Sequence, residues 1–197
     1  MKKVFSFLIF AVFLFAGEIN IKQIYEKSYN YEKMGDYKDA IKVLIPLLQK
    51  YPNGYTLNLR VAYLFFLNKN YANAIKYYEK ASAILPYSLE PKLGLARVYL
   101  AMGKYDNAIN VANTILKTDY YNYYGNYYLA RALYYKKDYK NALAITNKML
   151  TLYPTSVLYL TLLGEIYWNI DKKTAVKIFN DLLILDPNNV VAKSYLK

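Results

Sequence analysis

The sequence of 197 residues contains no cysteine and no histidine. Without cysteine the chain can form no disulfide bond, no zinc–thiolate site and no thiol nucleophile. Without histidine it lacks the usual general base and the commonest metal ligand, which excludes a Ser-His-Asp triad. Only 14 residues are Asp or Glu, and most of them lie in polar linkers or on predicted helix surfaces. The composition argues against an enzyme, and we predict no catalytic residue, no metal site and no cofactor.

The one strongly apolar run is too short to cross a bilayer as a helix. Val4–Ala16 is apolar apart from one serine and follows two lysines, whereas a membrane-spanning helix needs roughly 20 residues. The basic head, the apolar run and the small residues at its end are typical of a secretory signal peptide, which we assign to residues 1–17. We expect an exported, periplasmic or otherwise extracytoplasmic protein with no integral membrane span after cleavage. The alternative is an N-terminal membrane anchor, because a bulky residue stands three positions before the cleavage point.

The charge is strongly basic, with 26 Lys and Arg against 14 Asp and Glu. Such an excess often indicates nucleic acid as the partner. The lysines, however, are spread over the whole chain and no run is longer than two. A scattered pattern is typical of a solvated surface and not of a phosphate-binding stripe. We therefore expect no nucleic-acid partner.

A near copy of one segment recurs every 34 residues. "GDYKDAIKVLIPLLQKYP" begins at Gly35, and related segments begin at Lys69, Gly103 and Lys137. Each unit contains two helical patterns separated by a short polar turn, and proline ends the second helix in most units. Neither helix can bury its apolar stripe alone, but stacking one pair on the next can. The fixed interval predicts a stacked array and not an enzyme core.

With this 34-residue period the sequence resembles the tetratricopeptide repeat family. The resemblance implies an all-α, right-handed superhelical α-solenoid of five helix–turn–helix repeats, which we place at 21–54, 55–88, 89–122, 123–156 and 157–189. A small residue is expected where the two helices of a repeat cross, since close helix approach requires it. Those positions are Ala40, Ala74, Ala108, Ala142 and Ala175. The other small position that the family shares is occupied by Ser28, Ala62, Ala96, Ala130 and Gly164.

Three departures from the family pattern have structural consequences. The third unit closes with Tyr120 where its neighbours have proline, and the fifth is one residue short in its turn, "NIDKKTA". Residues 190–197 begin another helix and stop, so we interpret them as a partial C-terminal capping helix. Because this cap is short and half apolar, it leaves the C-terminal face incompletely covered and self-association open.

In the tetratricopeptide family the first helices of the repeats line a concave groove that binds peptides or protein segments. The resemblance therefore implies a non-catalytic interaction scaffold, which we expect to act in an envelope, pilus or secretion-related assembly. Two groove positions in the first repeat are tyrosines, Tyr25 and Tyr29, and one in the third is Leu93. The predicted ligand-binding residues are Arg60, Tyr63, Phe66, Arg97, Tyr124, Tyr127, Tyr128, Arg131, Tyr134 and Trp168.

The chain's three arginines all fall on this predicted face. A guanidinium group can hold a carboxylate with two hydrogen bonds and can stack on aromatic rings, whereas lysine cannot. This favours a protein or peptide partner with acidic side chains or a C-terminal carboxylate. The alternative is that the arginines pair with neighbouring acids of the chain itself, such as Glu165.

Tyrosine is the second bias, with eight tyrosines in the sixteen residues 120–135. Tyrosine rings give a large contact area at low entropic cost, so they are favoured at binding surfaces. Part of this cluster must pack between helices, because tyrosine is frequent throughout the chain. Aromatic-lined grooves also stack sugars, so a carbohydrate- or acidic-polymer-binding module is the alternative function.

Overall fold

The computed structural model describes residues 20–197, and the predicted signal peptide at residues 1–17 lies outside them. The described residues form twelve α-helices and no strand. The helices are α1 (Ile21–Lys33), α2 (Tyr37–Lys42), α3 (Ile45–Lys50), α4 (Tyr55–Leu67), α5 (Tyr71–Ile84), α6 (Glu90–Ala101), α7 (Tyr105–Thr118), α8 (Tyr123–Tyr135), α9 (Tyr139–Leu152), α10 (Val157–Ile170), α11 (Lys172–Leu185) and α12 (Val190–Tyr195). In residues 20–197 no helix is both long and apolar enough to span a membrane.

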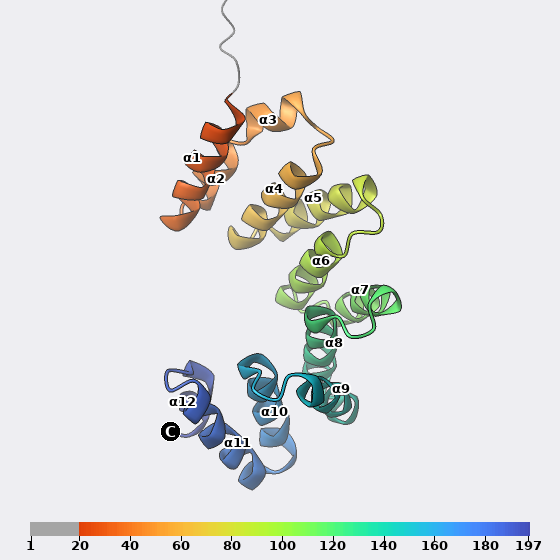
Figure 1. The fold of residues 1–197 in the computed structure, drawn as a ribbon, viewed down its shortest axis with the longest axis vertical. Helices are drawn as coiled ribbons and strands as arrows, with labels where there is room; N and C mark the ends of the chain where they lie inside the picture. Colours follow the sequence, from red (N-terminus) through yellow and green to blue (C-terminus); the bar gives the residue numbers. More distant parts are fainter. Residues whose placement is uncertain (1–19) are drawn as a thin grey trace, which may run out of the picture.

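The helices pair within each repeat, and the pairs stack in chain order. Neighbouring elements such as α4 and α5, or α10 and α11, make the most extensive contacts. The stack curves into an open C in Figure 1, with α5, α7 and α9 on its outer side and α4, α6 and α10 on its inner side. The all-α superhelical solenoid expected from the 34-residue period is confirmed.

Small side chains lie where the helices of a repeat cross, as the period predicts. The five alanines at the crossing position are all fully buried, and so are the small residues opposite them in the first four repeats. In the first repeat the Ser28 hydroxyl donates a hydrogen bond to the carbonyl oxygen of Ala40, at 2.9 Å. In the fifth repeat a Cβ on Gly164 would stand 2.4 Å from Cε1 of Phe179. Larger side chains at these positions would force the two helices apart.

The turn between the two helices of a repeat uses one backbone conformation four times. Gly35, Lys69, Gly103 and Lys137 all have positive φ, between 58° and 77°. This left-handed residue ends the first helix and lets the chain reverse direction within a few residues. Glycine adopts it without strain, whereas the two lysines adopt it at an energetic cost. The fifth repeat is one residue shorter, and there Asp171 alone joins α10 to α11 with φ −148°.

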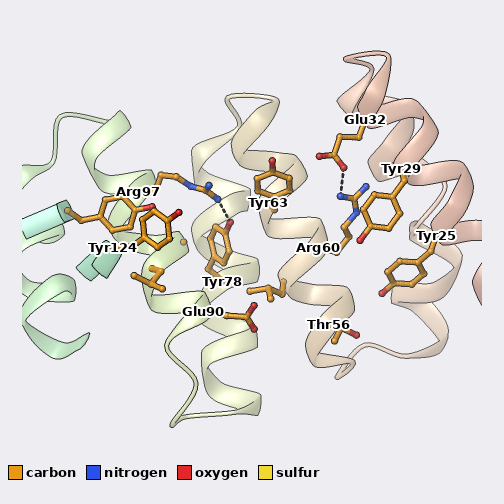
Figure 2. Close-up of a pocket in the computed structure, with 14 residues that line it drawn as sticks. Tyr25, Tyr29, Glu32, Thr56, Arg60, Tyr63, Tyr78, Glu90, Arg97 and Tyr124 are labelled. Atoms are coloured by element: carbon orange, nitrogen blue, oxygen red, sulfur yellow. Dashed lines mark hydrogen bonds and ion pairs between the residues drawn. The ribbon is translucent and has the colours of Figure 1, made fainter. Parts of the chain in front are cut away.

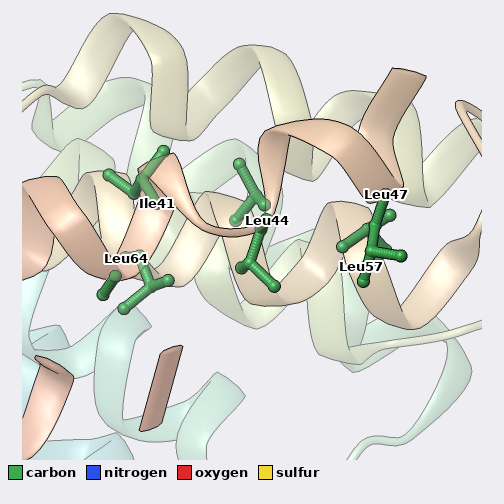
Figure 3. Close-up of a cluster of buried hydrophobic side chains, with 7 residues drawn as sticks. Ile41, Leu44, Leu47, Leu57 and Leu64 are labelled. Carbon is green, nitrogen blue, oxygen red and sulfur yellow. The ribbon is translucent and has the colours of Figure 1, made fainter. Parts of the chain in front are cut away.

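The second helix of the first repeat is broken, which the sequence pattern did not predict. Pro46 has no backbone N–H to offer to the preceding turn, and its ring clashes there. The helix therefore ends at Lys42, and α3 begins at Ile45 with Pro46 in its first turn. Apolar packing continues across the break, as Figure 3 shows. The buried side chains of this cluster include Ile41, Leu44, Leu47, Leu57 and Leu64.

The linkers between repeats are held by one side chain at the same position of the following helix. The Asn58 side-chain amide donates to the carbonyl oxygens of Pro52 and Gly54. In the next repeat the Lys92 ammonium donates to the carbonyl oxygens of Pro86 and Ser88. One repeat further on, the Asn126 amide donates to those of Tyr120 and Asn122. These bonds satisfy linker carbonyls that would otherwise lack partners. They keep the linkers in a fixed conformation.

The last helix, α12, packs on the fifth repeat in the place of a further first helix. Ala192 is fully buried against Phe179 and Leu182 of α11. The Tyr195 ring stacks on Phe179 at a centroid distance of 4.8 Å and lies 4.9 Å from the Trp168 ring. The short C-terminal segment therefore covers the aromatic end of the stack. Ile184 and Val190 remain largely exposed beside it.

Candidate functional site

A pocket of about 740 Å³ opens on the inner side of the first four repeats. Its walls come mainly from the first helices α1, α4, α6 and α8, as Figure 2 shows. Most of its side chains are aromatic or charged. It is lined by Tyr25, Tyr29, Glu32, Thr56, Leu59, Arg60, Tyr63, Tyr78, Glu90, Leu93, Gly94, Arg97, Tyr124 and Tyr128.

Helix α6 forms the centre of the pocket. Glu90, Leu93 and Arg97 are spaced by three and four residues, so they share one face of this helix. Gly94 lies on the same face and has no side chain, which leaves room for the Tyr78 ring that rises from α5 behind it. A Cβ at Gly94 would stand 2.3 Å from Cε1 of Tyr78. The glycine therefore lets a residue of a second helix reach the pocket.

Arg60 is neutralised within the protein. Its guanidinium group forms an ion pair with Glu32 of α1 and lies 3.8 Å above the centre of the Tyr29 ring. A second nitrogen donates to the Ser28 hydroxyl at 3.3 Å. Only 8% of the arginine side chain is exposed. This ion pair ties α4 to α1, and its charge is not available to a ligand without breaking the pair.

Arg97 has a different environment. In residues 20–197 no carboxylate pairs with it, and its only hydrogen bond is donated to the Tyr78 hydroxyl, at 3.2 Å. Its guanidinium carbon lies 4.5 Å from the centre of the Phe66 ring and 5.2 Å from that of Tyr63. Its buried Nε, like that of Arg60, has no hydrogen-bond partner in the described part of the chain. Arg97 is thus positioned by aromatic rings and keeps an uncompensated charge.

Tyrosine hydroxyls surround this guanidinium group and stay protonated at neutral pH. Burial raises the pKa of Tyr78 and of Tyr128, although the positive charge of Arg97 opposes this effect at both. Tyr124 is about half exposed, and its ring stacks against Tyr128 at a centroid distance of 6.3 Å. The pocket therefore offers a ligand ring faces, hydroxyl groups and a cation that no acid of the described chain neutralises.

Arg131 lies outside the pocket and is paired. Both of its terminal nitrogens bind the carboxylate of Glu165 on α10, and its guanidinium carbon lies 5.2 Å from the centre of the Tyr135 ring. Burial disfavours the charge, but the hydrogen bond and attraction of Glu165 outweigh it, so the pKa of Arg131 is raised. The pairing with Glu165 that the sequence left open as an alternative is present. Two of the three arginines on the predicted face, Arg60 and Arg131, are therefore already paired with acids of the chain.

The structure brings five of the ten predicted site residues into the pocket, namely Arg60, Tyr63, Arg97, Tyr124 and Tyr128. Phe66 lies beneath Arg97 and supports it. Tyr127 packs between α8 and α10, with its ring 5.9 Å from that of Tyr159. Tyr134 lies against Tyr139, beside Arg131. Trp168 is packed against α11 and α12.

Sequence reasoning missed the acidic residues and the second-helix tyrosine of the pocket. Glu32 and Glu90 stand at positions with no aromatic or arginine bias to mark them. Tyr78 lies on the apolar stripe of its helix and packs there, with 2% of its surface exposed, so its position in the sequence does not mark it as a pocket residue. The signal that could have found it is Gly94, because a glycine on a groove-facing position opens a path for the residue behind it. No group of three or more Asp and Glu side chains that could hold a metal ion occurs in residues 20–197.

Comparison with known families gives matches to repeat proteins. Two tetratricopeptide repeat models match residues 25–88 and 65–124, and together they span just over half of the chain. A third model, Anaphase-promoting complex, cyclosome, subunit 3, matches residues 102–180. Comparison with curated protein sequences gave no match.

Solved structures share the fold at low sequence identity. MamA from Desulfovibrio magneticus RS-1 is 18% identical, with a TM-score of 0.71 over 86% of this chain and 96% of that one. TTC0263, a thermophilic TPR protein in Thermus thermophilus, is 14% identical, with a TM-score of 0.73 over 89% and 96%. YrrB, a TPR protein with an unusual peptide-binding site, is 12% identical, with a TM-score of 0.63 over 87% and 89%. With the 34-residue period, the helix pairs and these matches, the chain belongs to the tetratricopeptide repeat family.

Proposed function

We propose that this protein is a non-catalytic scaffold that binds an extended segment of a partner protein in its inner groove, with Arg97 holding a carboxylate of that segment. One observation carries the proposal: of the three arginines, Arg97 is the one without an acidic partner within residues 20–197. A buried or half-buried arginine with no anion beside it is costly unless it serves a ligand. The family-level role in protein–protein interaction supports the same reading.

The surroundings of Arg97 prepare it for this task. Its guanidinium group is already held between Phe66, Tyr63 and the Tyr78 hydroxyl, so little rotamer freedom is lost on binding. A guanidinium–carboxylate contact is a charge-assisted hydrogen bond, roughly twice as strong as a neutral one. Arginine also presents its donors in a planar fork, which fits a carboxylate in one orientation.

The other end of the pocket has the opposite charge. Glu90 lies seven residues before Arg97 on α6, which at 1.5 Å per residue separates their backbones by about 10 Å. An extended peptide covers this distance in three residues. The hydroxyl of Tyr55 already donates to the Glu90 carboxylate at 2.9 Å, which leaves further acceptor capacity. We infer a segment with an acidic and a basic group three residues apart, whose apolar side chains rest on Leu93 and the tyrosine rings.

The cellular setting is a further part of the proposal. The apolar run at residues 4–16 supports export and a role in an envelope, pilus or secretion-related assembly. The same run supports the alternative, a scaffold tethered by its N-terminus. Both settings place the groove where partner segments of other exported proteins are available.

The test is a calorimetric titration against extended peptides that carry a carboxylate, a basic group three residues away, both, or neither. We expect the peptide with both groups to bind most tightly, and Arg97→Ala to weaken it roughly 30-fold or more, because about 2 kcal/mol is typical of a desolvated contact. Arg97→Lys keeps the charge but loses the fork, so it should weaken binding to an intermediate degree. Lys104→Ala, an exposed lysine in the turn before α7, is the matched control.

Neutral and acidic oligosaccharides form the second arm of this experiment, since tyrosine faces also stack sugars. Binding of an oligosaccharide with no binding of any peptide would replace the scaffold by the carbohydrate-binding alternative. Equal affinity of wild type and Arg97→Ala for the best peptide would overturn the assignment of Arg97.

A further inference from the structure

Large apolar side chains are exposed along the linkers between consecutive repeats, away from the groove. We define the linker rim as the linkers α3–α4, α5–α6 and α7–α8, with the residues that flank them. Its exposed apolar side chains are Tyr51, Leu85, Tyr87, Tyr120 and Tyr121, and Tyr87 has 93% of its surface in solvent. Nothing in the fold of residues 20–197 covers them.

The topology places these linkers on one side of the solenoid. In Figure 1 the first helices α1, α4 and α6 run in similar directions, so the segments that enter them lie on the same side of the solenoid. In Figure 1 the α3–α4, α5–α6 and α7–α8 linkers follow one another along the outer edge of the drawing, while the turns within repeats lie on the other side. Asn58, Lys92 and Asn126 hold the linker carbonyls. The linkers that make up the rim are therefore held in a fixed conformation.

Each of the three linkers combines exposed apolar surface with lysine. Lys50 lies 5.4 Å from the centre of the Tyr51 ring, and Lys148 lies 4.1 Å from that of Tyr120. Four lysines border the rim against two carboxylates, so its net charge is positive. The lysines are Lys50, Lys92, Lys117 and Lys148, and the carboxylates are Glu90 and Asp119.

We propose that the linker rim lies on an anionic lipid surface, independently of what the groove binds. Tyrosine has an apolar ring and a polar tip, and it is enriched at the boundary between membrane and water. Lysines beside such rings are attracted to anionic headgroups while their stems cover apolar surface. The exposed rim thus has the composition of a surface that rests in the headgroup region without spanning it.

The position of the N-terminal sequence points to the same side. Asn20 caps α1, which is a first helix, so the chain enters the solenoid at the rim that carries the linkers. In the uncleaved chain the thirteen-residue apolar stretch Val4–Ala16 precedes this point by only a few residues. In a chain that keeps this stretch as an anchor, attachment at this rim would turn the linkers, and not the opposite turns, toward a bilayer.

The absence of cysteine allows a direct test of orientation with the full chain. Single cysteines at Tyr51 and Tyr87 on the rim, and at Met34 and Lys104 in turns on the opposite side, are labelled with an environment-sensitive fluorophore. The labelled chains are reconstituted with vesicles of three parts phosphatidylcholine to one part phosphatidylglycerol. We expect blue-shifted emission and quenching by spin-labelled lipid at the two rim positions, and water-like emission at the two control positions.

Two variants separate the rim from the N-terminal stretch, which stays present in all chains. The double replacement Tyr51→Ser, Tyr120→Ser should reduce lipid quenching of a label at Tyr87 several-fold, whereas Met34→Ser should leave it unchanged. Vesicles of phosphatidylcholine alone, which carry no net charge, should also reduce the lipid quenching of the label at Tyr87. Water-like emission at all four positions, or equal quenching on both sides, would overturn the proposal. Blue-shifted emission of the rim labels in the absence of vesicles, increasing with protein concentration, would also overturn the proposal. It would indicate contact with a second copy of the chain.

Discussion

The ion pair between Arg131 and Glu165 allows the strongest quantitative prediction about stability. It joins α8 to α10, and only 19% and 9% of the two side chains are exposed. Removal of one partner from a buried pair typically costs about 3–5 kcal/mol, because the other charge stays buried without compensation. Arg131 also lies 5.6 Å from the centre of the Tyr134 ring, which leaves part of its stabilisation in place. We therefore expect Glu165→Leu to lower the free energy of unfolding by about 3 kcal/mol.

The double variant Arg131→Met, Glu165→Leu tests the cause of this loss. Replacing both charges by apolar side chains of similar size removes the buried charge, so stability should return to within about 1–2 kcal/mol of wild type. The assay is urea unfolding followed by far-UV circular dichroism. Asp106→Ala, which breaks the exposed pair with Lys136, is the control and should cost less than about 1 kcal/mol. If Glu165→Leu costs no more than this control, the pair is solvent-screened and the reasoning fails.

Three further predictions follow from single features. Gly94→Ala should displace the Tyr78 ring, lower the free energy of unfolding by about 1–3 kcal/mol, and weaken peptide binding, measured by urea unfolding and calorimetry. Burial raises the pKa of Tyr134 to about 12 and raises that of Tyr159, so the folded state binds these protons more tightly than the unfolded state does. The contribution of these two tyrosines to stability should therefore be constant below about pH 10 and fall as the pH rises toward 12, as thermal melts between pH 8 and pH 12 would show. Finally, the mature chain should begin at Gly17 or Glu18 by intact-mass measurement, whereas retention of residues 1–16 in the membrane fraction would favour the anchor.

The repeat architecture could be predicted because it depends on local, periodic features. Small residues mark where the helices cross, and turn residues mark where the chain reverses, both at an interval of 34 residues. These features fix the helix pairs independently of the residues on the rest of the surface. The broken helix of the first repeat was less accessible, since Pro46 is compatible with a helix start as well as with a kink. Its effect depends on whether the residues before it can leave the helix. Here Val43 and Leu44 do so, since α2 ends at Lys42 and α3 begins at Ile45.

The site was predicted in part, for a physical reason. The family resemblance indicated which side chains face the groove, helical spacing agreed that they share one face, and half of those chosen line the pocket. Spacing does not show which charges are already neutralised, because Arg60 and Arg131 find their acids in neighbouring repeats about 30 residues away along the chain. The same limit hid Tyr78, whose path to the pocket depends on the missing side chain of Gly94 in the next repeat.

The most direct test of the central claim is a double-mutant cycle between Arg97 and one carboxylate of the bound peptide. Affinities are measured by calorimetry for wild type and Arg97→Ala, each with the carboxylate peptide and its uncharged amide. We predict a coupling energy of about 1.5 kcal/mol or more, which is typical of a close charge pair. Losses that simply add, with a coupling energy near zero, would contradict the account.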